Sequence, residues 1–159
     1  MKNLWDFCGA VYRDDDVKAL CLKLQNIHGV DVPMFLAMHW VENGGLFEGD
    51  FADLTDIVAP AAQWQTDKVI PLRAKRREVF EKEGRGQAYA DAMKQELAAE
   101  KQQIEMIEKA ILGQKPAGAD LTTPLNFASA YLATKNVSEN DVADADRILK
   151  RAMKEQLSN

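Results

Sequence analysis

The sequence predicts an all-α protein: a single-domain bundle of about seven helices around a buried apolar central helix at residues 31–43. Apolar residues in the stretch DVPMFLAMHW fall on every side of a helical wheel, so other helices must surround this segment. Elsewhere the apolar residues recur at intervals of three and four, which is typical of amphipathic helices. No segment shows the strict alternation of a convincing strand. Helices packed on one central helix are therefore expected.

Two amphipathic helices are expected before the central one. Residues 3–13 form the first, with Asn3 as its N-cap. The acidic run 14–16 opens the second, because carboxylates complement the positive end of a helix dipole. Gly29 is placed to end that helix in a left-handed conformation, and Asp31 is placed to cap the central helix.

Several short stretches resemble a small bacterial family of unknown function. They are Leu4-Trp5-Asp6-Phe7, Cys21-Leu22-Lys23-Leu24-Gln25, His28-Gly29-Val30-Asp31-Val32, Trp40, Trp64, Val69-Ile70-Pro71-Leu72-Arg73 and Arg76-Arg77. The resemblance covers roughly residues 3 to 112 of the chain. It implies an all-helical bacterial protein and supplies no activity.

The middle of the chain is expected to form a long helical hairpin. Asp50 caps the first helix of this hairpin. Pro60 and Pro71 are each expected to kink or break that helix, because proline removes a backbone donor. A second long helix spans residues 87–112 and packs antiparallel to the first. Its expected apolar stripe is Ala90, Met93, Leu97, Ile104, Ile107 and Ile111.

Composition divides the chain into a core domain and a shorter C-terminal part. Residues 1–112 are expected to form the helical core, and residues 113–120, which contain glycine and proline, to form a linker. Residues 121–159 form a C-terminal helical pair that is either docked on the core or partly mobile. Ser138 is placed to cap the last helix.

Charge and composition narrow the class of protein. A net charge of -5 gives no general attraction to nucleic acid or to anionic membranes, and no apolar run is long enough to span a bilayer. No secretory signal is evident, so a cytoplasmic location is expected. The two cysteines, Cys8 and Cys21, lie in apolar helical patterns and are expected to be reduced core residues.

No set of residues predicts a catalytic or metal centre. His39 and Glu42 are spaced for one helical face, but the chain has two histidines and no Glu-x-x-His motif, so the ligand set is incomplete. A neutral core histidine is the simpler interpretation of His39. Cys21 and His28 are seven residues apart, roughly 10 Å along a helix, which is too far for an activated nucleophile. We therefore expect no catalytic residue, no metal and no cofactor.

The basic run contains Arg73, Arg76 and Arg77 and is the one concentrated cationic patch in the sequence. It could bind the phosphates of an anionic ligand or of a nucleic acid. Acidic residues follow it immediately, which favours a solvated helical face with internal ion pairs.

Three functions remain open. The leading hypothesis is a non-enzymatic regulatory or adaptor module that binds another cytoplasmic protein, because long amphipathic helices are present and convergent titratable groups are not. The alternative is a small-molecule-binding bundle or an enzyme, with a pocket beside the central helix lined by His28, His39, Trp40 and Glu42. The third is phosphate or nucleic-acid contact through residues 73–77.

Overall fold

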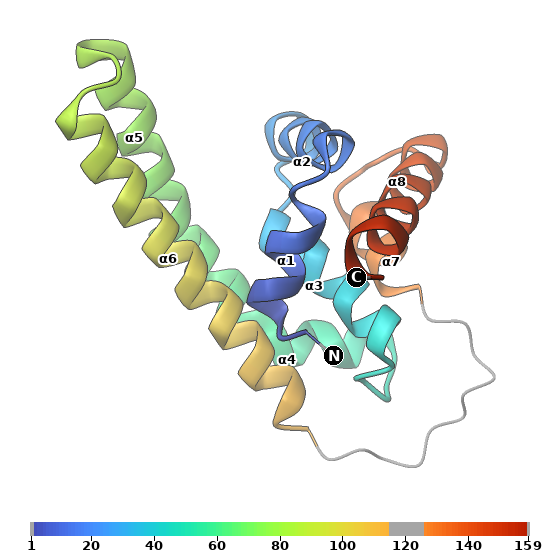
Figure 1. The fold of residues 1–159 in the computed structure, drawn as a ribbon. Helices are drawn as coiled ribbons and strands as arrows, with labels where there is room; N and C mark the ends of the chain where they lie inside the picture. The colour runs from blue at the N-terminus through green and yellow to red at the C-terminus, as the bar shows by residue number, and fades with distance from the viewer. Residues whose placement is uncertain (1, 115–125, 159) are drawn as a thin grey trace.

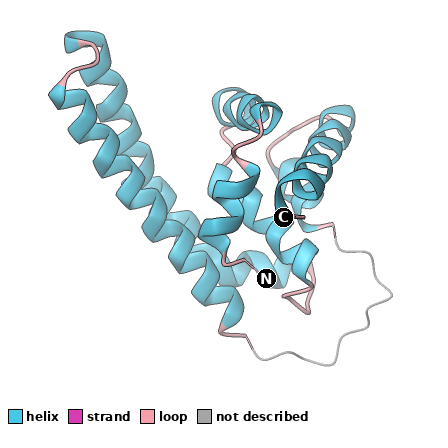
Figure 2. Cartoon of the chain, in the orientation of Figure 1, coloured by secondary structure: helices cyan, strands magenta, loops and turns pink. Residues whose placement is uncertain are grey.

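A computed structural model describes residues 2–114 and 126–158, and every regular element among them is helical (Figure 2). The elements are α1 (Leu4–Val11), α2 (Asp15–His28), α3 (Val32–Gly44), α4 (Phe51–Trp64), the π-helical segment η1 (Gln65–Val69), α5 (Ile70–Glu83), α6 (Gln87–Leu112), α7 (Phe127–Thr134) and α8 (Glu139–Leu157). Because α4, η1 and α5 follow one another without a loop, they form one continuous helical segment, which we call the α4–α5 rod. The all-α prediction is confirmed. None of the described helices combines the length and the apolar character needed to cross a membrane.

Short polar side chains begin five of the helices. The capping residues are Asn3, Asp14, Asp31, Asp50 and Ser138. Each accepts a hydrogen bond from a first-turn N–H that has no partner inside its helix. Gly29 ends α2 with a φ of 64°, which is the left-handed conformation expected for it.

α3 is the central helix. Every residue from Pro33 to Val41 is buried, and α3 packs against α1, α2, α6 and α7. The side chains of Phe35, Met38 and Trp40 are at most 2% exposed. The predicted buried helix is therefore confirmed.

The α4–α5 rod changes its geometry near one of its two prolines. α4 continues through Pro60, so a break there is wrong. Pro60 and Asp56, four residues earlier, lie on the exposed side, where water can bind the carbonyl that proline leaves free. The change comes before Pro71, where the N–H of Ile70 donates to the carbonyl of Gln65 in the wider π-helical turn. Such turns are frequent at functional sites.

α5 and α6 form the expected antiparallel hairpin. Its end at the turn between the two helices extends away from the other helices, whereas α6 also packs against α1, α3 and α4 (Figure 1). We call this hairpin the arm. The predicted stripe of α6 is confirmed at Ile104, Ile107 and Ile111, which are buried. It is wrong in the first half of α6, where Leu97 is 50% exposed. The buried positions there are Ala92, Glu96, Ala99 and Gln103. The buried face of this half of α6 therefore differs from the predicted apolar stripe: Glu96 faces the basic residues of α5, and Leu97 faces outward.

α7 and α8 pack on the N-terminal helices. α7 contacts α3, and α8 contacts α1, α2 and α7. The guanidinium of Arg151 on α8 donates to both carboxylate oxygens of Asp14, at 3.0 and 3.1 Å, which ties α8 to the start of α2. The predicted linker lies mostly outside the described residues, which resume at Asn126.

Cys8 and Cys21 are both buried and free. Burial raises the pKa of each thiol to about 12. Both are therefore protonated at neutral pH and serve as small apolar core side chains, as the sequence predicts.

Candidate functional site

The four predicted ligand-binding residues do not line one pocket. Trp40 is buried, and its indole Nε1 donates to the carbonyl of Lys2 at 3.0 Å. His28 borders a hollow between α2 and α8. His39 and Glu42 border a different hollow, between α3 and α8. Two of the four residues therefore lie together.

The three predicted anion-binding residues divide between two environments. Arg73 is buried and donates to Glu96 at 3.1 Å and to Glu100 at 3.3 Å. Arg76 also donates to Glu96, and this hydrogen bond raises the pKa of its guanidinium. The two glutamates of α6 neutralise much of the charge of these arginines. Arg77 makes no such pair among the described residues.

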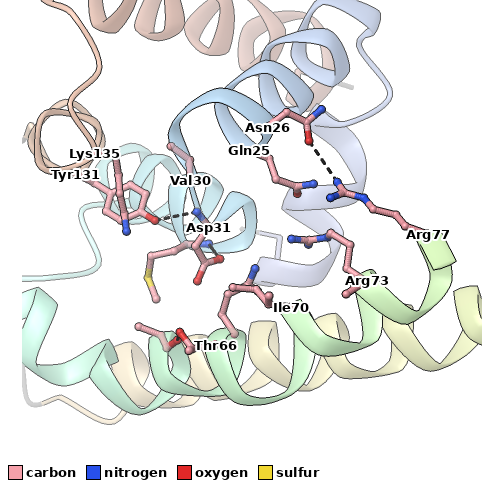
Figure 3. Close-up of a pocket in the computed structure, with 15 residues that line it drawn as sticks. Gln25, Asn26, Val30, Asp31, Thr66, Ile70, Arg73, Arg77, Tyr131 and Lys135 are labelled. Carbon is pink, nitrogen blue, oxygen red and sulfur yellow. Dashed lines mark hydrogen bonds between the residues drawn. The ribbon is translucent and has the colours of Figure 1, made fainter.

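A pocket of about 470 Å³ lies between α2, η1, α5 and α7, at the start of α3. We call it the Asp31 pocket. Its polar lining consists of Gln25, Asn26, Asp31, Gln65, Thr66, Arg73, Arg77, Tyr131 and Lys135. Figure 3 shows Arg73 and Arg77 on one side of Asp31, with Tyr131 and Lys135 on the other. The volume falls in the range of roughly 300 to 1,000 Å³ that small-molecule sites occupy.

Asp31 supplies the carboxyl among the described residues that line the pocket, and the pKa of this group is shifted. Burial raises its pKa to about 6, and hydrogen bonds from the N–H of Met34 and the side-chain amide of Gln103 offset that rise in part. The backbone N–H of Asp31 donates to the hydroxyl of Tyr131 at 3.0 Å, which joins α7 to the head of α3. The carboxyl can therefore be an acceptor when charged or a donor when protonated, within the pH range of a cell.

Two buried glutamine side chains beside Asp31 keep free acceptor atoms. Gln65 is 5% exposed, and its Oε1 has no hydrogen-bond partner among the described residues. The Oε1 of Gln103 is likewise free within the described part of the chain, although the Nε2 of Gln103 donates to Asp31 at 2.7 Å and to the carbonyl of Ala61 at 3.3 Å. An unpaired buried polar atom costs about 1 to 3 kcal/mol. Gln65 lines the pocket, so rotation of its amide would let a bound ligand donate to this oxygen.

Arg77 and Lys135 supply the available positive charge of the Asp31 pocket. The guanidinium of Arg77 donates to Asn26 Oδ1 at 3.3 Å. The ammonium of Lys135 lies 5.8 Å from the ring centroid of Tyr131. Neither residue forms an ion pair within the described part of the chain, so both can bind an anion without first breaking a salt bridge.

His39 and Glu42 meet Asp146 of α8. One potential ligand atom from each side chain lies within 4.8 Å of the others. His39 is 1% exposed, and burial lowers its pKa to about 4, so its imidazole is neutral at neutral pH. Its Nε2 has no hydrogen-bond partner among the described residues. Burial raises the pKa of Glu42, although that carboxylate accepts a hydrogen bond from the N–H of Ala128 at 2.8 Å.

Sequence reasoning missed the residues that join these sites to distant helices. Gln103 carried a signal, because it lies four residues before Ile107 on the buried stripe of α6. Tyr131, Lys135 and Asp146 carried none, since they are about a hundred residues along the chain from the α3 residues that they approach. Local spacing contains no information on such pairs.

A family model described as "Protein of unknown function (DUF2390)" matches residues 3–107. The chain belongs to this family. The finding confirms the resemblance seen in the sequence. The DUF2390 match runs from α1 into α6 and includes Asp31 and Arg77, whereas Tyr131, Lys135 and Asp146 lie beyond it. No curated protein and no solved structure matches the chain.

Proposed function

We propose that this protein binds a small anionic metabolite in the Asp31 pocket. The observation that carries the proposal is the position of Arg77 and Lys135, two cations without ion-pair partners among the described residues, on opposite sides of one pocket. An anionic group bound between them would gain charge-assisted hydrogen bonds. This function corresponds to the second of the three possibilities left open by the sequence, at a different pocket.

The remaining polar groups suggest the rest of the ligand. Gln65 offers an acceptor oxygen, and Asp31 offers a carboxyl that is buried in the same pocket. A ligand with a hydroxyl or amino group at a distance from its anionic end would satisfy them. We therefore propose a compound the size of a sugar phosphate or a hydroxy acid. Most of the lining groups are carried by helices, which hold them in fixed orientations for such a ligand.

A nucleic acid suits this site less well than a small molecule. Glu96 and Glu100 lie against Arg73 and Arg76 and reduce the positive field of the basic run. The net charge of the chain is -5, which opposes long-range attraction to a polyanion. Arg77 and Lys135 face a concave pocket and form no extended basic stripe within the part of the chain that the structure describes.

The proposal is tested by thermal unfolding against a panel of sugar phosphates, nucleoside monophosphates and short hydroxy acids. A true ligand raises Tm in proportion to the logarithm of its concentration. Isothermal titration calorimetry then measures Kd for the wild type and for Arg77→Ala and Lys135→Ala. Loss of a charge-assisted contact is expected to weaken binding by about tenfold or more. Lys75→Ala is the control, because Lys75 is exposed on α5 and does not line the pocket.

Two results would contradict a metabolite site. One is the absence of any Tm shift across the panel. The other is a ligand whose affinity is the same for Arg77→Ala, Lys135→Ala and Lys75→Ala, since such a ligand binds elsewhere.

The arm supports the adaptor hypothesis as a second candidate. It projects from the body, and its end carries the half-exposed ring of Phe80, which contacts Tyr89 at a centroid distance of 5.6 Å. Exposed aromatic side chains of this kind are common in protein interfaces. We propose that another cytoplasmic protein docks there. A photo-crosslinking residue at position 80 should trap one dominant partner that the same residue at exposed position 109 does not, and identical products from both positions would oppose this role.

A further inference from the structure

We propose that His39, Glu42 and Asp146 bind a divalent transition-metal ion at the junction of α3, α7 and α8. One donor atom from each side chain lies within 4.8 Å of the others. Donors that share one ion at about 2.1 Å lie roughly 3 to 3.5 Å apart, so modest side-chain rotations bring these three into a coordination sphere. The site is separate from the Asp31 pocket, because none of its three residues lines that pocket.

Helix geometry places the three ligands. His39 and Glu42 are spaced i, i+3 on α3, so their side chains project from one face. Asp146 comes from α8, whose side chains border the same hollow as His39 and Glu42. The N–H of Ala128 at the start of α7 donates to Glu42 at 2.8 Å and holds its carboxylate in place. Hydrogen bonds of this kind orient metal ligands in proteins.

The ring of His39 provides the observation that is independent of the carboxylates. It is 1% exposed, and its Nε2 nitrogen is buried without a hydrogen-bond partner among the described residues. The ring of Phe35 packs edge-on against it, with centroids 5.0 Å apart, and so limits its rotation. A neutral imidazole next to two carboxylates can donate a nitrogen lone pair to a cation.

The charges around the cluster suit a divalent ion. Two carboxylates and a neutral imidazole together balance a charge of two. Asp146 now pairs with the ammonium of Lys150 at 2.8 Å, but the Lys150 side chain is 66% exposed and can withdraw into water. His39 and Glu42 also border a hollow of about 580 Å³, which leaves room for water beside the cluster.

The donor types select among metals. Imidazole nitrogen favours late first-row transition ions such as Zn²⁺ over Mn²⁺, Mg²⁺ and Ca²⁺, which prefer oxygen ligands. Three protein ligands would leave at least one coordination position open to water, as in zinc sites that exchange ligands with solvent. We therefore expect Zn²⁺ to bind more tightly than Mn²⁺, Mg²⁺ and Ca²⁺.

The experiment uses the full chain, freed of metal with a chelator and then dialysed against ZnCl₂. Elemental analysis and calorimetry should find one ion per chain. Asp146→Asn should weaken binding by about tenfold or more. Asp144→Asn is the matched control, since Asp144 is on the same helix, its side chain is 62% exposed, and it lies outside the cluster. Circular dichroism confirms that both variants are folded.

The two histidines supply a second readout that does not depend on a substitution. On addition of Zn²⁺ the imidazole NMR signals of His39 should shift, and those of His28, which borders another hollow, should not. The proposal is overturned by less than stoichiometric binding, by equal affinity of Asp146→Asn and Asp144→Asn, or by a Zn²⁺ response at His28 in place of His39.

Discussion

Asp31 joins the capping of the central helix to the chemistry of the pocket. Its Oδ1 accepts the N–H of Met34, which an N-cap must do, while its Oδ2 accepts the amide of Gln103 on α6. Burial of this carboxyl disfavours its charged form. The same side chain therefore stabilises the start of α3 and holds a proton that most aspartates lose well below neutral pH.

Replacement of Asp31 by asparagine should change how stability depends on pH. Burial raises the folded pKa of Asp31 to about 6, above the reference value of 3.8, so the folded state holds more protons between these pH values. Stability of the wild type consequently falls as pH rises through that window. The asparagine side chain keeps a capping oxygen and does not titrate. The gain in unfolding free energy on Asp31→Asn should grow by up to about 3 kcal/mol from pH ~4 to ~7 in urea titrations.

Asp14→Asn is the control for that titration. The hydrogen bond from Arg151 lowers the pKa of Asp14, which is the opposite direction to the shift of Asp31. The effect of Asp14→Asn on stability should therefore not grow from pH ~5 to ~7. A constant effect of Asp31→Asn as well would show that the carboxyl of Asp31 is charged throughout.

At the scale of single helices, most helix ends follow from the local sequence. The choice of residues buried between the two helices of the arm does not. The side of α6 that faces α5 buries Glu96, because Arg73 and Arg76 donate to it. The ion pairs of Glu96 with Arg73 and Arg76 add to apolar packing in fixing the register of α5 on α6. Apolar periodicity alone predicts a different rotation of α6, with Leu97 inside.

Two glycines offer a matched test of helix conformation. Gly29 has a φ of 64°, and a methyl group added there would meet no atom within 4 Å, so Gly29→Ala would add left-handed strain and no clash. A cost of about 1 to 2 kcal/mol is expected. Gly9 lies inside α1, also with nothing within 4 Å, and Gly9→Ala should stabilise by about 0.5 to 1 kcal/mol. Urea denaturation of both variants measures these changes, and effects of the same sign would contradict the assigned conformations.

At the scale of the whole molecule, the C-terminal helices complete both candidate sites. α7 supplies Tyr131 to the Asp31 pocket, and Lys135, the residue after the end of α7, also lines this pocket. α8 supplies Asp146 to the cluster with His39 and Glu42. They also contribute core residues, namely Phe127, Ala128, Leu132, Ala145, Leu149 and Ala152. The part of the chain that matches the family model therefore depends on helices beyond it to cover α3.

A chain that ends after Gln114 should lose cooperative folding. Burial of a large apolar side chain stabilises by about 1.5 to 3 kcal/mol, and a domain has a net stability of about 5 to 15 kcal/mol. Removal of α7 and α8 discards several such side chains and exposes their partners on α1, α2 and α3. Calorimetry of this fragment should show no sharp unfolding transition, in contrast to the full chain. A sharp transition would support the independent core domain expected from composition at residues 1–112.

The sequence by itself determined the helices, their caps and the identity of the buried one. These features depend on residues within four or five positions of one another, as Asn3, Asp14 and Gly29 illustrate. It also located His39 beside Glu42 and the arginines of α5, because helical spacing is local information. The expected break at Pro60 is wrong, because the effect of a proline depends on whether water reaches the freed carbonyl, which is a property of the fold.

Tertiary structure alone decided which polar groups converge. Asp31 meets Tyr131 and Gln103, and His39 meets Asp146, through contacts between helices that are 72 or more residues apart along the chain. Such contacts depend on the packing angles between helices. The periodicity of a sequence predicts which face of a helix is buried, but it does not predict which residues lie opposite that face. The perturbed ionisation of Asp31 has the same origin, because desolvation depends on every helix that closes over the carboxyl.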